Sequence, residues 1–264
     1  MKIVIDGAVD LPLPSPGVVS VPGQILKDRQ PWFGELSQFW STLRSDPLGW
    51  STAPPATDEL AAAYRGGEPV LAVHVSAELS ATVEHGRDAA EAARLAVAVC
   101  DSRSLSVGAG LVVTGLDSGE ADPEKLSRRA AHLVARTHTY VLVDQVDYLL
   151  RSGRLGLLEG EHIKSRRHYL LAVKGHAIPL GHSRTRERAF ASLLGHLLAT
   201  APGGIEAWAL SHGSAADVET LTARAVHDIG FGPEFVVLLD PTVGIHVGPD
   251  AVIVAARAQA EGDR

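Results

Sequence analysis

The chain has 264 residues, with 24 lysines and arginines against 31 aspartates and glutamates, which gives a formal net charge of −7. Hydrophobic residues make up 45% and charged residues 21%, and these ordinary globular values exclude a disordered or fibrous chain. The acidic balance argues against a nucleic-acid partner, because nucleic-acid-binding proteins present a basic face. The single cysteine, Cys100, excludes an internal disulfide and a Cys-x-x-Cys metal site.

Neither a signal peptide nor a membrane span is expected. Asp6 and Asp10 fall where the apolar part of a signal peptide would lie. The longest stretch without Asp, Glu, Lys or Arg, residues 189–205, contains Pro202 and Gly203 and is shorter than the ~20 apolar residues that a span needs. We therefore expect a soluble, cytoplasmic protein without stable membrane insertion.

In the first half of the chain, short apolar runs alternate with helical patterns. Strands are predicted at 2–5, 18–21, 69–75, 97–100 and 140–143. The later runs are almost continuously apolar, which is typical of a parallel sheet that is covered on both faces.

Helices are predicted between these strands. Apolar residues recur at helical spacing over 36–43, and another helix opens at Thr57. Asp122 is suited to cap a third helix, with Pro123 at its first position, where a missing N–H costs nothing. The order of strand, helix and strand predicts a parallel α/β domain.

The pattern changes after Gly153. Strands at 170–173 and 176–180 are predicted to form a hairpin around Lys174-Gly175. We therefore predict an N-terminal parallel α/β domain over 1–153 and a smaller C-terminal α/β domain over 154–264 with a mixed or antiparallel sheet, the boundary falling near 150–160. Further predicted elements are a helix at 185–200, a strand at 206–211, a helix capped by Ser214 and ended by Gly230, and strands at 235–239 and 251–255.

Sequence motifs for the commonest cofactors are absent. There is no GxxxxGK[ST] loop, and Gly108 and Gly110 lack the third glycine of a dinucleotide fingerprint. The chain has no G-x-S-x-G nucleophile elbow. Its 12 histidines do not show the spacing of a zinc site, so we expect neither a metal nor a cofactor.

The segment 74–82 is the first candidate for a binding site. Its apolar run ends at Val75, and Ser80 is expected to begin a helix that runs to about Leu95. Ligands of open parallel sheets bind at the carboxyl ends of the strands, and a hydroxyl beside a helix N-terminus suits an anion. A purely structural interpretation, in which Ser80 only caps its helix, fits the same pattern.

Three further segments carry candidate polar groups. Ser51 and Thr52 precede a Pro-Pro sequence and could contact a ligand. The same sequence also suits a rigid loop between two secondary-structure elements. Residues 241–249 are predicted to form a glycine loop whose one ionisable residue is His246. Arg154 follows a predicted helix end, where cations are favoured in any case.

Taken in order, six segments resemble motifs of the DegV family of fatty-acid-binding proteins, whose members include the lipid-carrying subunits of bacterial fatty acid kinase. The segments are distributed over nearly the whole chain, and six motifs in order are far more specific than one. They are VIDGAVDLP (4–12), WSTAPPAT (50–57), HVSAELSAT (74–82), VAVCDSRSLSVGAG (97–110), VDQVDYLLRSGRLG (143–156) and VGIHVGPDAV (243–252).

The resemblance implies a two-domain α/β fold that holds a long-chain fatty acid in an apolar tunnel. It implies that the carboxylate is bound by Ser80, His246 and Ser51, with Thr52 as the alternative to Ser51, and that Arg154 matches a family arginine. Such a protein is a carrier without chemistry of its own, and the resemblance points to a fatty acid kinase as its partner.

The chain departs from the family motifs mainly around the expected head group. Gly7 and Ala8 stand where the family has a Ser-Thr pair, and Val247 replaces a threonine beside His246. Three prolines within 12–16 also leave little room for the helix that the family has after its first strand.

An enzyme remains the alternative hypothesis. Ser80 would be the nucleophile of an esterase or thioesterase, with His246 as its base and Asp101 or Asp144 as the orienting carboxylate. A third hypothesis is a regulatory or structural protein with a filled core and no ligand.

Overall fold

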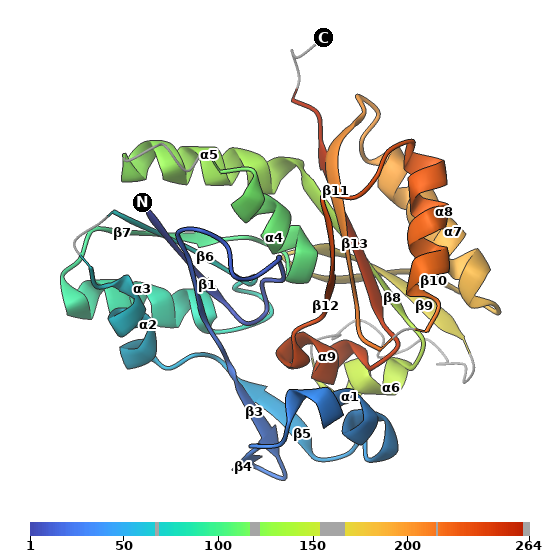
Figure 1. The fold of residues 1–264 in the computed structure, drawn as a ribbon, viewed down its shortest axis with the longest axis horizontal. Coiled ribbons are helices and arrows are strands. Elements are labelled where there is room, and N and C mark those ends of the chain that lie inside the picture. Colours follow the sequence, from blue (N-terminus) through green and yellow to red (C-terminus); the bar gives the residue numbers. More distant parts are fainter. Residues whose placement is uncertain (67–68, 117–121, 154–166, 215, 261–264) are drawn as a thin grey trace.

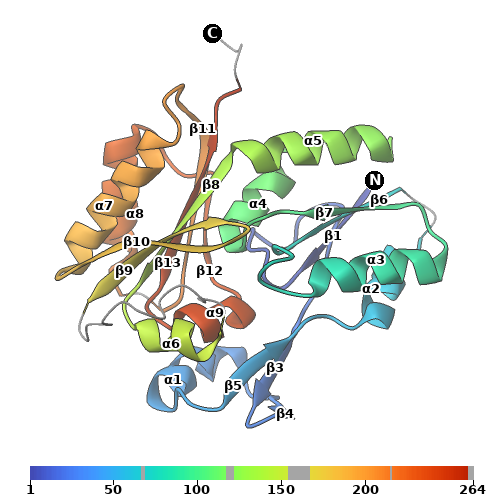
Figure 2. The same ribbon diagram turned by 180° about the vertical axis from the view of Figure 1, so that it is seen from behind.

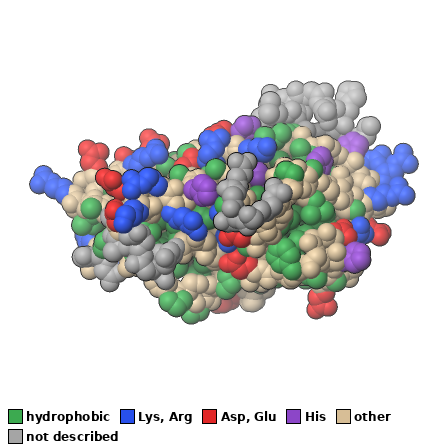
Figure 3. All heavy atoms as spheres, turned by 90° about the horizontal axis from the view of Figure 1, so that it is seen from above, with side chains coloured by type: hydrophobic (Ala, Val, Ile, Leu, Met, Phe, Trp, Pro, Cys, Tyr) green, Lys and Arg blue, Asp and Glu red, His purple; other side chains and the backbone are tan. Residues whose placement is uncertain are grey.

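The computed structural model describes residues 1–66, 69–116, 122–153, 167–214 and 216–260. Its described strands form three sheets, and helices cover the two larger ones (Figure 1). None of the described helices is long and apolar enough to cross a lipid bilayer. On the face seen in Figure 3, acidic and basic side chains are interspersed, so this face offers no broad basic surface.

The first sheet is wholly parallel and has the strand order β2-β1-β6-β7. Both faces of β1 and β6 are buried, which explains their nearly continuous apolar sequences. One face packs against α2 and α3, and the other against α4 and α5 (Figure 1). The bounds are β1 Lys2–Asp6, β2 Val18–Val21, β6 Val70–His74, β7 Val97–Asp101, α2 Thr57–Tyr64, α3 Thr82–Ala93, α4 Ser106–Thr114 and α5 Pro123–Arg136.

A small lobe is inserted between β2 and α2. Its antiparallel sheet has the order β4-β3-β5, and its helix α1 follows the predicted helical spacing. Four aromatic rings pack edge to face within the lobe: Trp32, Phe39, Trp40 and Trp50. The bounds are β3 Gln24–Lys27, β4 Gln30–Pro31, α1 Leu36–Ser45 and β5 Trp50–Ala53.

The second large sheet is mixed and has the order β10-β9-β8-β13-β11-β12. Only its β11–β12 pair is parallel. Helices α7 and α8 cover its outer face, while the turn between β9 and β10 reaches the first sheet (Figure 2). The bounds are β8 Thr137–Val143, β9 His168–Lys174, β10 His176–Ser183, β11 Ile205–His212, β12 Phe235–Leu238, β13 Val252–Ala258, α7 Arg186–Ala199 and α8 Val218–Ile229.

The apolar sequence of strand β8 predicted a strand of the parallel sheet, but β8 is not part of that sheet. It lies in the mixed sheet, antiparallel to both β9 and β13. Alternate side chains of β8 enter two different cores, so both faces are buried and the apolar run carries no information about direction. The second sheet thus begins before residue 153, and the division into 1–153 and 154–264 stays a proposal.

Two local predictions near the end of the chain were wrong. Ser214 does not cap α8, whose N-cap is Asp217, and its hydroxyl accepts a hydrogen bond from Arg44 instead. Residues 241–249 are not a glycine loop, because Pro241–Val247 form helix α9. Asp240 caps this helix by accepting from the Thr242 amide at 2.8 Å, and Pro241 occupies the first position.

Candidate functional site

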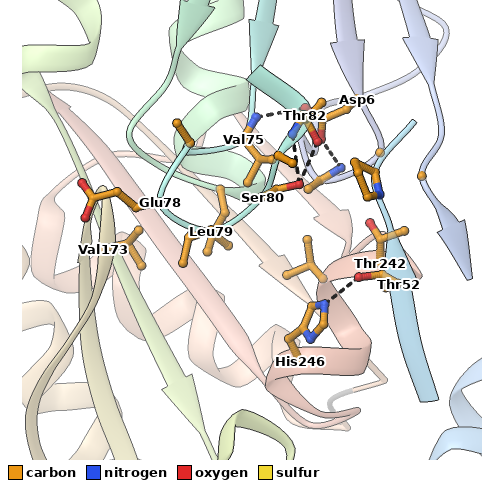
Figure 4. Close-up of a pocket in the computed structure, with 18 of the residues that line it drawn as sticks. Asp6, Thr52, Val75, Glu78, Leu79, Ser80, Thr82, Val173, Thr242 and His246 are labelled. Carbon is orange, nitrogen blue, oxygen red and sulfur yellow. Dashed lines mark hydrogen bonds between the residues drawn. The ribbon is translucent and has the colours of Figure 1, made fainter. Parts of the chain in front are cut away.

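A cavity of about 470 Å³ lies between the two large sheets. One wall is a face of the mixed sheet, and the opposite wall is the loop that follows β6 (Figure 4). Helix α9 and the short helix α6 (Val146–Arg151) contribute further side chains. The position agrees with the general rule that ligands bind beyond the carboxyl ends of parallel strands.

The body of the cavity is apolar. The register of the mixed sheet places Val141 opposite Leu171, and Val173 opposite Ala177, and all four side chains line the cavity. The other apolar lining residues include Val75, Leu79, Leu105, Leu149, Val243 and Val247. Such a surface suits an aliphatic ligand, because burying its methylenes removes apolar area from water.

Thr52 and His246 meet at one end of the cavity. The Thr52 hydroxyl lies 2.9 Å from His246 Nε2, although the residues are 194 positions apart in sequence (Figure 4). Strand β5 supplies Thr52, and α9 supplies His246. Two of the predicted site residues are thereby brought into direct contact.

Ser51 lies on the opposite face of β5, because side chains alternate along a strand. It lines a second cavity of about 270 Å³, which shares Thr52 and His246 with the first. Arg151 also lines this second cavity, with its guanidinium 4.9 Å from the centre of the Tyr148 ring. The predicted contact of Arg154 lies outside the described residues.

Ser80 also lines the main cavity, in the loop between β6 and α3. The N-cap of α3 is Ala81 and makes no side-chain cap bond, so Ser80 is not the capping residue that its spacing suggested. The Ser80 hydroxyl lies 2.8 Å from the hydroxyl of Thr82, which is buried. Ser80 therefore presents a half-buried hydroxyl beside the first turn of a helix, where an anion is favoured.

A buried polar cluster that the sequence did not reveal fixes this loop. Asp6 Oδ2 accepts from the Val75 amide at 2.9 Å and lies 3.1 Å from His74 Nδ1. His74 Nε2 lies 3.2 Å from the Tyr64 hydroxyl, and burial raises the pKa of Tyr64 above its usual range. The cluster ties the ends of β1 and β6 together and so positions the loop that carries Ser80.

Two further carboxyls, the buried Asp10 and the half-buried Asp240, lie close to the polar end. Burial raises the pKa of Asp10 to about 8, and it also raises the pKa of Asp240. Asp10 Oδ1 accepts from the Asp240 amide at 3.0 Å, and its Oδ2 lies 2.5 Å from the Ser106 hydroxyl. These contacts hold the residues before α9 against the loop that follows β1.

The hydrogen bonds of the site do not follow the order of a catalytic triad. The hydroxyl bonded to His246 Nε2 belongs to Thr52, and the Ser80 hydroxyl is bonded to Thr82. The two candidate carboxylates are engaged elsewhere. Asp101 accepts from the amides of Ala77 and Arg103, whereas Asp144 contacts His168 and Arg186. The geometry thus gives the esterase hypothesis no support.

Comparison with known proteins agrees with this architecture. A family model described as "Uncharacterised protein, DegV family" matches residues 2–259. A DegV domain-containing protein of Mycobacterium tuberculosis is 30% identical over 220 residues, which cover 76% of this chain and 77% of the relative.

Two solved structures share the fold at low sequence identity. A stearic acid-binding protein from Eubacterium ventriosum superposes with a TM-score of 0.86 at 18% identity, covering 97% of this chain and 98% of the other. A DegV family protein from Thermus thermophilus, described as binding fatty acid, superposes with a TM-score of 0.82 at 22% identity. The superposition covers 98% of this chain and 99% of the other. With the family match over nearly the whole sequence, the chain belongs to the DegV family.

Proposed function

We propose that the protein is a cytoplasmic carrier that binds a long-chain fatty acid in the main cavity. The acyl chain lies along the apolar wall of the mixed sheet, and the carboxylate faces Thr52, Ser80 and His246. Presentation of the bound acid to a fatty acid kinase is a further step that the sequence resemblance implies. Ser51 and Arg154, which were also predicted to contact the carboxylate, stay secondary candidates.

The observation that carries the proposal is the distribution of polarity in the cavity. Apart from the exposed Glu78 and Glu84, its polar side chains gather at one end, and the rest of the lining is apolar (Figure 4). A fatty acid has the same distribution. Solved relatives with this fold are described as binding fatty acids, one of them stearic acid.

The energetics of such a complex are adequate. Burying about ten methylenes contributes roughly 8 kcal/mol at ~0.8 kcal/mol each. A carboxylate buried without partners would cost much of this gain, so it needs hydrogen bonds. The hydroxyls of Thr52 and Ser80 and the imidazole of His246 can supply them.

We expect the purified protein to contain a long-chain fatty acid. Denaturing extraction with an organic solvent, followed by mass spectrometry, should release an acyl species in molar proportion to the protein. A mock purification from cells without the expressed protein is the control. If the extract contains no acyl species above this control, and the delipidated protein binds neither palmitate nor oleate, the proposed function is wrong.

We expect Thr52→Val and Ser80→Ala each to weaken fatty-acid binding by ~1–3 kcal/mol, because each removes a hydrogen-bond partner of a buried carboxylate. Ser51→Ala is the matched control, since this hydroxyl lies on the other face of β5 and does not line the main cavity. Isothermal titration of the delipidated proteins with one acid measures the three changes. Equal affinities for wild type, Thr52→Val and Ser80→Ala would show that the carboxylate does not bind at this end of the cavity.

A further inference from the structure

We infer that Ala177, together with its cross-strand neighbour Val173, determines the length of the acyl chain that the cavity accepts. This inference rests on the proposed function and concerns the end of the cavity far from Thr52 and His246.

The placement of Val173 is the first argument. Val173 lies on the opposite side of the cavity from Thr52 and His246, close to Glu78 (Figure 4). Ala177 is its direct partner in the antiparallel register of β9 and β10. An acyl chain that begins at the polar end and follows the wall of the sheet therefore reaches this pair last.

Polar contacts beyond this pair limit further extension. Glu78 Oε2 lies 2.9 Å from His176 Nδ1, and Glu78 Oε1 lies 3.4 Å from an Arg103 nitrogen. The amide of Gly175 donates to the Arg103 carbonyl at 2.6 Å, so the turn of the hairpin is fixed against the loop that follows β7 and carries Arg103. These side chains are exposed, so a longer chain would pass from the apolar cavity to a polar surface in contact with water, where its additional methylenes gain little from burial.

The size and direction of Ala177 complete the argument. Its methyl group is the smallest side chain in the row formed with Val141, Leu171 and Val173, so it leaves space where the chain would end. The next residue, Ile178, packs into the core under α7 on the other face of the sheet. A larger side chain at 177 would therefore fill the cavity without entering that core.

The test compares the affinities of wild type, Ala177→Leu and Val173→Ala for a series of saturated acids from decanoic to eicosanoic acid. In Ala177→Leu, the longest acid that wild type binds well should lose tenfold or more in affinity. Acids roughly three carbons shorter should keep their affinity. Leucine has three more carbon atoms than alanine, and these would occupy the space of about three carbons of the acyl chain. Val173→Ala should shift the preference towards longer acids.

Ala62→Leu is the matched control, because it makes the same chemical change at an exposed position of α2. Its chain-length profile should equal that of wild type. Thermal unfolding shows which variants are folded. If Ala177→Leu does not fold, the inference is tested by the chain-length preference of Val173→Ala alone.

Three results separate the inference from the proposed function. If wild type binds no acid of the series, the proposed function has failed. If wild type binds but the folded variants keep its chain-length preference, or lose affinity equally for all lengths, the inference is overturned while the function stands. Opposite shifts in the two variants support the inference.

Discussion

We expect the free energy of unfolding to fall as pH rises towards 8, and we expect Asp10→Asn to flatten this fall. Burial raises the pKa of Asp10 from 3.8 to about 8. Between these values the folded protein keeps a proton on Asp10 that the unfolded chain has lost. The free energy of unfolding therefore decreases as pH rises through this range, and it levels off above the folded-state value.

Asparagine is suited to replace the protonated acid at this position. Its carbonyl can accept from the Asp240 amide, as Asp10 Oδ1 does, and its amide can donate to the Ser106 hydroxyl. That hydroxyl lies 2.7 Å from the hydroxyl of Ser211, so the chain of hydrogen bonds can continue. At ~1.4 kcal/mol per pKa unit, the difference between wild type and variant should change by a few kcal/mol between pH 5 and 8.

Urea unfolding at a series of pH values measures this change. Asp46→Asn is the control, because a hydrogen bond from Lys27 lowers the pKa of this exposed carboxyl. Its contribution is present above the unfolded pKa and is lost only as pH falls below it, so its slope between pH 5 and 8 should match wild type. The raised pKa of Asp240 leaves a residual fall in the Asp10 variant. Parallel profiles for wild type and Asp10→Asn would mean that Asp10 is ionised in the folded protein.

Gly110→Ala is expected to lower the free energy of unfolding by ~3 kcal/mol or more, although alanine is the better helix former. Gly110 is buried in α4, and a Cβ atom there would lie 2.1 Å from the carbonyl oxygen of Asp10. That oxygen belongs to the backbone, so relief requires α4 to move away from the loop after β1. Such a movement would also disturb Phe235, whose ring lies 3.3 Å from the same position.

Gly195→Ala is the matched control for this change. Gly195 lies in α7, and a Cβ atom there would meet nothing within 4 Å. The intrinsic preference of helices for alanine then predicts a gain of up to ~1 kcal/mol. Urea midpoints with unchanged m-values measure both effects. A loss of equal size at both positions would show that close approach of the backbone is not the reason for glycine at 110.

The parallel sheet and the β9–β10 hairpin could be predicted because their signals are local. The runs at β1, β6 and β7 are apolar except at their ends. Gly175, with a φ of +89°, allows the tight turn of the hairpin. Strand direction is not local. Strand β8 has the composition of a parallel strand. Its antiparallel neighbours are β9, the next described strand, and β13, which lies far away in the sequence.

The small lobe and helix α9 show where composition misleads. Strand β3 contains Gln24 and Lys27 and has no strong apolar pattern, and it is held by pairing with β5. Gly244 suggested a loop in α9, but a Cβ atom there would lie 2.4 Å from the Trp40 ring, so the glycine allows close packing. Only the three-dimensional structure reveals this second reason for a glycine.

The site residues could be identified as candidates, but not their arrangement. To choose between Ser51 and Thr52, one must know which side chains of β5 point towards the main cavity. This depends on the pairing of β5 with β3. The contact between Thr52 and His246 depends on the packing of α9 against the lobe. The cluster of Asp6, His74 and Tyr64 gave no sequence signal, because an aspartate and a histidine at strand ends are common.

Strand β13 lies between β8 and β11, in the middle of the mixed sheet, although it comes later in the sequence than every other described strand. Before residues 252–258 leave the ribosome, β8 and β11 therefore have no partner between them, and the two halves of the sheet are unconnected. The wall of the cavity is complete only when this strand has been inserted. A nascent chain that stops short of β13 therefore lacks this part of the wall and exposes two unpaired strand edges, one on β8 and one on β11, which are prone to aggregation.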